Sequence, residues 1–108
     1  MAMTAAQCMD LLIEAGLYLS GALYDSETAV TSVTYDSKEA TDGTLFFCKG
    51  AAFKTEYLME AVRRGAVCYV SETAYPEALC SYLIVSDVRR AMAVLGAAFY
   101  GHADRALD

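Results

Sequence analysis

Polar side chains follow two apolar, strand-like runs near the middle of the chain, and these side chains could serve a ligand. The first run ends in Asp36, Ser37 and Lys38, which bring a carboxylate, a hydroxyl and an ammonium group together. The second run ends in Lys49 and Gly50, and two alanines follow, so that side chains shield the backbone amides there very little. Hydroxyls, cations and open amides are the groups that bind phosphates and nucleotides. The pattern therefore predicts a pocket for a phosphorylated or nucleotide ligand.

Ser37 is the strongest candidate for a ligand contact. Its hydroxyl can form hydrogen bonds with a nucleotide base or a phosphate group. The alternative is a loop serine that hydrogen-bonds its own backbone, which is the commoner situation when the residue types alone are considered. Tyr35 lies two residues earlier, which places it on the same side of an expected strand. Its ring could stack on a base or be an ordinary strand aromatic.

The sequence offers no catalytic set of its own. It contains no G-x-x-x-x-G-K-[ST] loop, the motif that cradles the phosphates of ATP. No carboxylate pair, Ser/His/Asp set or Cys/His set is recognisable. The two pairs of neighbouring arginines, at 63–64 and 89–90, are interpreted as solvated helix faces. We expect no ATP hydrolysis by this chain alone.

The cysteines are interpreted as reduced and buried. No two of them have C-x-x-C spacing, and the only histidine is His102, so a structural zinc site is not expected. An even number of cysteines in a short chain can also indicate disulfides. Two of the four lie inside apolar runs, however, where a thiol acts as a small hydrophobe. The four are Cys8, Cys48, Cys68 and Cys80.

Composition narrows the class of protein. The chain has 108 residues, of which 56% are hydrophobic and 20% charged, a mixture that suits one globular domain. Its formal net charge of -6 disfavours general binding to nucleic acid, although a few local donors can still hold a small anion. No apolar run approaches the roughly 20 residues that span a bilayer, and no basic segment precedes an apolar stretch at the N-terminus. We expect a cytoplasmic protein without membrane contact.

The elements that must position the candidate residues alternate along the second half of the chain. Helices are expected from Thr4 to Ala15, from a Thr55 cap to Gly65, and from a Ser86 cap, with Asp87 in the first turn, to a stop at Gly101. Strands are expected over 30–35, 44–48, 66–70 and 82–85. Residues 17–28 could form short extended pieces, and Pro76 could open a short helical turn.

This alternation predicts an α/β fold. A small, mostly parallel or mixed sheet flanked by helices is expected, with right-handed crossovers, in one domain over residues 1–108.

Several ordered motifs resemble the N-terminal domain of the Mur ligases, and most of all the muramyl-tripeptide synthetase branch. They are Asp-Ser-Lys at 36–38, Asp-Gly-Thr-Leu-Phe-Phe at 42–47 with Gly50, the helix end at 64–67, and the run 87–102. The resemblance implies a Mur ligase N-terminal fold that binds the UDP part of UDP-N-acetylmuramoyl-dipeptide. It also implies that ATP, magnesium and amide-bond formation belong to the ATP-binding and C-terminal domains of a parent ligase in cell-wall synthesis. No cofactor is expected in this chain.

The resemblance also implies which residues contact the nucleotide. Ser37 matches a serine that touches it, and Tyr35 matches a position in the uracil pocket. The segment after the second strand matches the part that contacts the diphosphate and sugar. Lys38 stands where the family usually has arginine. Residues 51–55 replace the family's usual polar segment and are about one residue shorter, so backbone amides and Lys54 would have to bind there. The expected ligand residues are Tyr35, Ser37, Gly50, Ala51, Ala52, Phe53 and Lys54.

A second class of function stays open on the sequence. The chain could be a free-standing, non-catalytic module that binds a nucleotide or another protein. A glycine-rich ATP loop shortly after Asp108 in the reading frame would favour the ligase.

Overall fold

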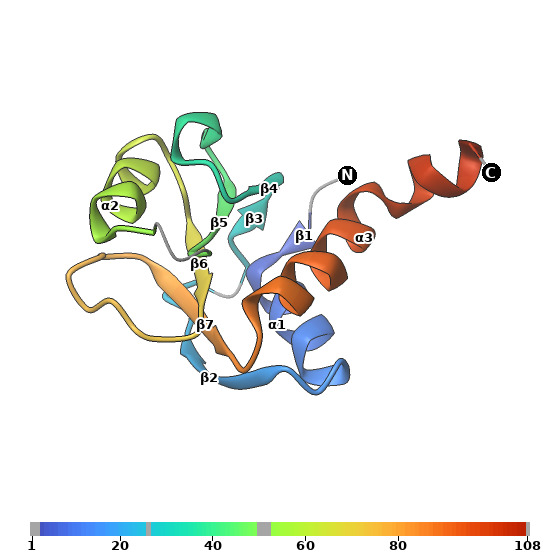
Figure 1. Ribbon diagram of the computed structural model, residues 1–108, viewed down its shortest axis with the longest axis horizontal. Coiled ribbons are helices and arrows are strands. Elements are labelled where there is room, and N and C mark those ends of the chain that lie inside the picture. Colours follow the sequence, from blue (N-terminus) through green and yellow to red (C-terminus); the bar gives the residue numbers. More distant parts are fainter. Residues whose placement is uncertain (1–2, 26, 50–52, 108) are drawn as a thin grey trace.

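A five-stranded mixed sheet forms the centre of the molecule (Figure 1). The computed structural model describes residues 3–25, 27–49 and 53–107. Four neighbouring strands of the sheet are parallel, and the fifth, β2, pairs antiparallel with β7 at one edge. In spatial order the strands are β2 (Tyr18–Ala22), β7 (Ser81–Val85), β6 (Cys68–Ser71), β5 (Thr44–Phe47) and β4 (Ser32–Thr34). The predicted α/β fold with a mixed sheet is confirmed.

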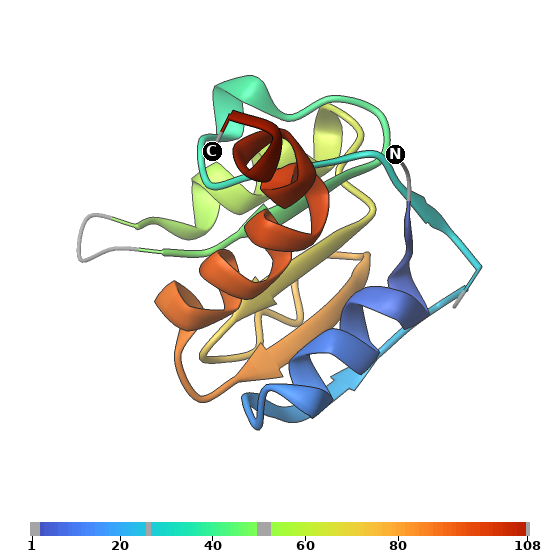
Figure 2. The ribbon, with the colours of Figure 1, turned by 90° about the vertical axis from the view of Figure 1, so that its right-hand side faces the viewer.

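Helices cover both faces of this sheet. Helix α2 (Thr55–Arg63) lies on one face, and α1 (Ala5–Glu14) and α3 (Val88–Leu107) lie side by side on the other (Figures 1 and 2). Thr4 and Gln7 form the capping box that starts α1, and Gly16 follows its end with a φ of 75°. Among the described residues, no helix is long and apolar enough to cross a membrane.

The two helical layers explain why the central strands carry apolar residues on both faces. Leu45 and Phe47 of β5 pack in the core under α1 and α3, whereas Phe46 between them packs in the core under α2. Strand β6 alternates in the same way, with Cys68 on the first side and Tyr69 on the second. Strands buried on both faces read as continuous apolar runs, as the sequence indicated.

The prediction of one strand over 30–35 is wrong. The segment divides into β3 (Ala29–Val30), which pairs antiparallel with β1 (Met3–Thr4) in a separate two-stranded sheet, and β4, which pairs with β5. Thr31 forms the corner because its N–H donates to the Gly43 carbonyl at 2.9 Å and its hydroxyl donates to the Asp42 carbonyl at 3.1 Å. These hydrogen bonds join residues that are eleven and twelve positions apart in the sequence. The strand propensities of residues 30–35 therefore do not indicate the break at Thr31.

Three predicted helix boundaries also need correction. Lys54, not Thr55, is the N-cap of α2, and its side chain makes no capping hydrogen bond. Asp87 rather than Ser86 caps α3, because the Arg90 N–H donates to the Asp87 carboxylate at 3.2 Å. The same helix continues through position 101 to Leu107.

The segment at Pro76 is a turn and not a helix. The Ala78 N–H donates to the Tyr75 carbonyl at 3.0 Å, and no helix is assigned between β6 and β7. The extended pieces expected over 17–28 correspond to β2.

Candidate functional site

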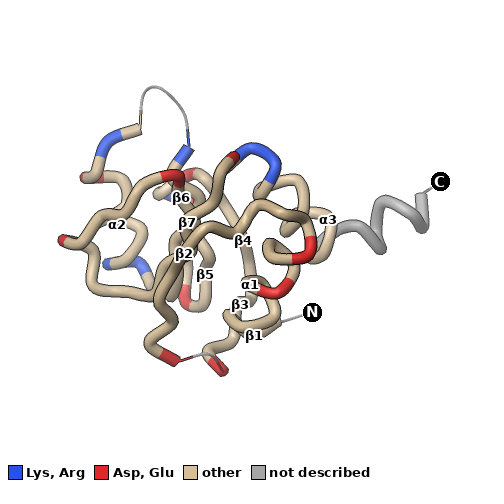
Figure 3. The backbone as a smooth tube through the Cα atoms, turned by 90° about the horizontal axis from the view of Figure 1, so that it is seen from below, with Lys and Arg blue, Asp and Glu red and all other residues tan. Residues whose placement is uncertain are grey.

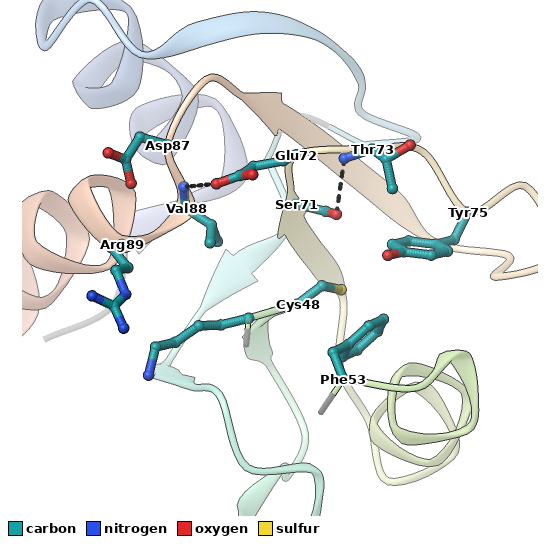
Figure 4. Close-up of a pocket in the computed structure, with 10 residues that line it drawn as sticks. Cys48, Phe53, Ser71, Glu72, Thr73, Tyr75, Asp87, Val88 and Arg89 are labelled. Atoms are coloured by element: carbon teal, nitrogen blue, oxygen red, sulfur yellow. Dashed lines mark hydrogen bonds between the residues drawn. The ribbon is translucent and has the colours of Figure 1, made fainter. Parts of the chain in front are cut away.

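The carboxyl ends of the parallel strands form a cleft of about 560 Å³, called here the main cleft (Figure 4). Because β5, β6 and β7 run in the same direction, the residues that follow them meet at one edge of the sheet, where ligands bind in α/β folds. In Figure 4, Phe53 and Tyr75 lie on one side of the cleft, and Asp87 and Arg89 lie on the other. The cleft is lined by Cys48, Lys49, Phe53, Ser71, Glu72, Thr73, Tyr75, Asp87, Val88 and Arg89.

The protein's own carboxylates occupy the start of α3 in this cleft. Glu72 accepts the Val88 N–H at 2.9 Å, and Asp87 accepts the Arg90 N–H at 3.2 Å. Negative charge at a helix N-terminus is favourable, and here side chains already supply it. An anionic ligand in the main cleft would therefore meet the cations of Lys49 and Arg89 rather than the end of the helix.

A second hollow of about 300 Å³, the side cleft, is lined by Tyr35, Asp36, Ser37, Lys38 and Tyr57. The Lys49 ammonium lies 4.7 Å from the centre of the Tyr35 ring, so a residue of the main cleft touches one of the side cleft. The two loops that the sequence singled out therefore meet in space. Asp36 fixes its own loop, because its carboxylate accepts the Lys38 N–H at 2.9 Å.

Ser37 and Tyr35 differ in their surroundings. Ser37 is the first residue of the short 3-10 helix η1 (Ser37–Glu39) and is buried, whereas Tyr35 is 58% exposed. The expectation that both lie on one side of a strand is wrong, because Tyr35 follows the end of β4 and the chain turns before Ser37. Both nevertheless line the side cleft.

The Ser37 hydroxyl is held by α2. It donates to Oε1 of Glu60 at 3.2 Å, and Nε and Nη2 of Arg64 both donate to Oε2 of the same carboxylate at 3.2 Å. The hydrogen bond from Arg64, followed by that from Ser37, lowers the pKa of the Glu60 carboxyl below its usual value. Glu60 is thus a carboxylate near neutral pH and can only accept from Ser37.

The remaining predicted residues fall into three groups. Phe53 lines the main cleft, and its ring centroid lies 6.3 Å from that of Tyr57 and 5.4 Å from that of Tyr75. Because Tyr57 lines the side cleft, this ring contact joins residues of the two clefts. Lys54 is exposed and is not among the residues that line either cleft. The third group, Gly50, Ala51 and Ala52, lies outside the described residues.

The sequence interpretation missed the polar wall of the main cleft. Glu72 and Thr73 follow β6, and Asp87 and Arg89 follow β7. Arg89 was interpreted as part of a solvated face; it is exposed, and it also lines the cleft. Their position in the sequence could have identified these residues, because polar residues directly after parallel strands gather at the edge of the sheet where ligands bind.

All four cysteines are free and buried, as expected for reduced thiols. Cys48 forms part of the main cleft, and burial is the largest cause that raises its pKa to about 12. A thiol with such a pKa holds its proton at neutral pH and is a weak nucleophile. In the described part of the chain, no group of three or more His, Cys, Asp or Glu residues could hold a metal ion.

Basic and acidic residues are interspersed in the part of the chain that the structure describes. Figure 3 shows Lys and Arg in separate places along the described backbone, with Asp and Glu between them.

Comparison with known proteins gives consistent relatives. The UDP-N-acetylmuramyl-tripeptide synthetase of Ligilactobacillus salivarius is 45% identical over 102 residues, which are 94% of this chain and 20% of that protein. The UDP-N-acetylmuramoyl-L-alanyl-D-glutamate--L-lysine ligase of Streptococcus pneumoniae is 44% identical over 77 residues, which are 71% of this chain and 16% of that protein. The chain thus spans about a fifth of the length of the curated relatives that it matches. No protein-family profile matches it.

Solved structures support the fold. A crystal structure of MurF from Acinetobacter baumannii superimposes with a TM-score of 0.69 at 24% identity, over 90% of this chain and 21% of that one. The resemblance drawn from the sequence motifs is confirmed by the curated relatives, and the α/β architecture by this structure.

Proposed function

We propose that this chain, which is homologous to part of the Mur ligases, is the N-terminal, UDP-recognising domain of such an enzyme. The parent would be a cytoplasmic UDP-N-acetylmuramoyl-L-alanyl-D-glutamate–amino acid ligase in peptidoglycan precursor synthesis. In this proposal the chain holds the nucleotide end of the substrate, while ATP, magnesium and amide-bond formation belong to other domains. Anchoring a remote, unreactive part of a substrate positions the part that reacts.

The contact between Lys49 and Tyr35 is the observation that carries this proposal. It places a cation and an exposed aromatic ring 4.7 Å apart, where the main cleft and the side cleft meet. A nucleoside diphosphate offers a flat base for the ring and negative oxygens for the ammonium. The cleft volumes of about 560 and 300 Å³ lie within the range of small-molecule sites.

The arrangement favours one orientation of the nucleotide. The uridine would enter the side cleft beside Tyr35 and Ser37, and the diphosphate would lie against Lys49. The sugar and peptide would then extend over the main cleft, where Arg89 supplies a second cation. Each of these contacts uses a group that the described structure leaves at the surface of a cleft.

The test is a titration of the labelled chain with UDP, followed by amide chemical shifts. Shifts should appear at residues 35–38, 49 and 53, around both clefts. Lys49→Met should weaken UDP binding several-fold through loss of a charged contact. Arg63→Met is the matched control that should change it little, because Arg63 is an exposed cation on α2 that lines neither cleft. Shifts confined to the separate hollow lined by Thr55, Glu56, Met59 and Arg63 would refute the proposed site. No shifts at millimolar UDP would refute nucleotide recognition by this domain.

A further inference from the structure

The Ser37 hydroxyl has one proton, and the structure shows where that proton goes. Ser37 donates to Glu60 Oε1 at 3.2 Å, and Glu60 has no proton of its own to return because Arg64 and Ser37 hold its pKa below the usual value. The oxygen of Ser37 still has lone pairs. What Ser37 can present to the side cleft is therefore an acceptor and not a donor.

We infer that Glu60 is a positioning residue that makes Ser37 a hydrogen-bond acceptor, so that the side cleft selects a nucleoside N–H or O–H donor. This inference rests on the proposed UDP site and names which part of the nucleotide Ser37 recognises. A phosphate oxygen carries no proton near neutral pH and would face a second acceptor. Uracil N3–H and the ribose hydroxyls are the donors that UDP offers.

The pairing of Glu60 with Arg64 gives this polarity a structural basis. Arg64 approaches Oε2 with both Nε and Nη2 at 3.2 Å, which leaves Oε1 directed to Ser37. The serine is buried, whereas the side chains of Glu60 and Arg64 are 33% and 46% exposed. Substitutions at position 60 should therefore be tolerated by the fold.

Glu60→Gln should turn Ser37 from an acceptor into a donor toward the side cleft, because glutamine has almost the same shape as glutamate but carries an NH₂ group. Arg64 can only donate, so it should keep an oxygen as its partner, namely the amide oxygen of the substituted side chain. The amide NH₂ of that side chain then faces Ser37 and donates to it. The serine proton is released and turns toward the cleft, where it opposes a ligand donor and favours a ligand acceptor.

The experiment compares UDP with 3-methyl-UDP, 2′-deoxy-UDP and 3′-deoxy-UDP, each of which lacks one donor. Dissociation constants are measured by amide-shift titration on the unsubstituted chain and on Glu60→Gln, Ser37→Ala and the control Glu56→Gln. Glu56 lies on the same helix and is exposed. The readout is the ratio of affinities for UDP and each analogue. General loosening of the site would weaken all ligands together and leave this ratio unchanged.

One analogue should bind the unsubstituted chain and Glu56→Gln about three- to tenfold more weakly than UDP, as expected for one lost hydrogen bond. A loss with the 3-methyl compound identifies the base donor, and a loss with a deoxy compound identifies a ribose donor. In Glu60→Gln and Ser37→Ala, the ratio of the affinity for UDP to the affinity for that analogue should fall toward one, because Ser37 no longer accepts a hydrogen bond from the ligand.

Three results would overturn the inference. If UDP binds at the clefts but every ratio is near one, or the ratio persists in Glu60→Gln, Ser37 is not an acceptor set by Glu60, and the proposed function stands. If UDP does not bind at the clefts, both proposals fail.

Discussion

At the scale of single residues, Ser37 connects the side cleft with helix α2. It lines the side cleft, yet it is buried and tied to a carboxylate 23 positions later in the chain. A motif can show that a serine follows a strand, but not which partner a distant helix will bring to it. The structure therefore adds the direction of the hydrogen bond, which the sequence left open between donor and acceptor.

Ser37→Ala should weaken UDP binding by about 0.5–1.5 kcal/mol, or roughly two- to tenfold, because one hydrogen bond to the ligand is lost. The measurement is the dissociation constant from amide-shift titration at neutral pH. Ser20→Ala is a suitable control, since Ser20 is exposed on β2 at the opposite edge of the sheet from β4. Equal affinities for the two variants would show that the Ser37 hydroxyl makes no contact with the nucleotide.

Gly65 is a residue whose backbone only glycine adopts readily. Its φ is 119°, and an added Cβ would lie 2.7 Å from the Asp42 Cα. Gly65→Ala should lower the free energy of unfolding by about 1–3 kcal/mol or more, as measured by denaturant titration. Gly96→Ala in α3 meets nothing within 4 Å and should raise it by about 0.5–1 kcal/mol. A Gly65→Ala variant as stable as the unsubstituted chain would contradict this account of the turn.

At the scale of elements, the sequence predicted best those segments whose environment is uniform. Strands β5 and β6 are buried on both faces, so their apolar runs mark them plainly. The helices were marked by apolar periodicity and, at α1, by the capping box. Strand β2 was not resolved as one strand because its middle residues are exposed and it contains Gly21.

The division of residues 29–34 could not be predicted, because hydrogen bonds from Thr31 to positions 42 and 43 decide it. The candidate site shows the same limit. The loop after β4 and the end of β5 were identified by local residue types, whereas Glu60, Glu72 and Asp87 enter the site through the topology of the sheet.

At the scale of the whole molecule, the two cores make stability sensitive to alkaline pH. Burial is the largest cause that raises the pKa of Cys8 and Cys80 to about 11 and that of Cys48 to about 12. Thiols of the unfolded chain lose their protons near pH 8.5. Above that pH the unfolded state binds fewer protons than the folded state, so the free energy of unfolding falls as pH rises.

The denaturation midpoint should therefore fall progressively between about pH 9 and pH 11, and the stability contributed by protonated thiols should be fully present below about pH 8. The four thiols should also resist Ellman's reagent at pH 8 until denaturant is added, because they are buried. Rapid labelling of the native chain at pH 8 would contradict the buried, protonated state of these cysteines.

The central claim is that this molecule holds the uridine end of a nucleotide at the carboxyl edge of its sheet. The most direct measurement is an intermolecular nuclear Overhauser spectrum of the labelled chain with excess UDP. We expect cross-peaks between uracil H5 or H6 and the ring protons of Tyr35, which is 58% exposed and lines the side cleft. Cross-peaks from the uracil to Met59 or Thr55, which line the separate hollow on α2, with none to Tyr35, would contradict the claim.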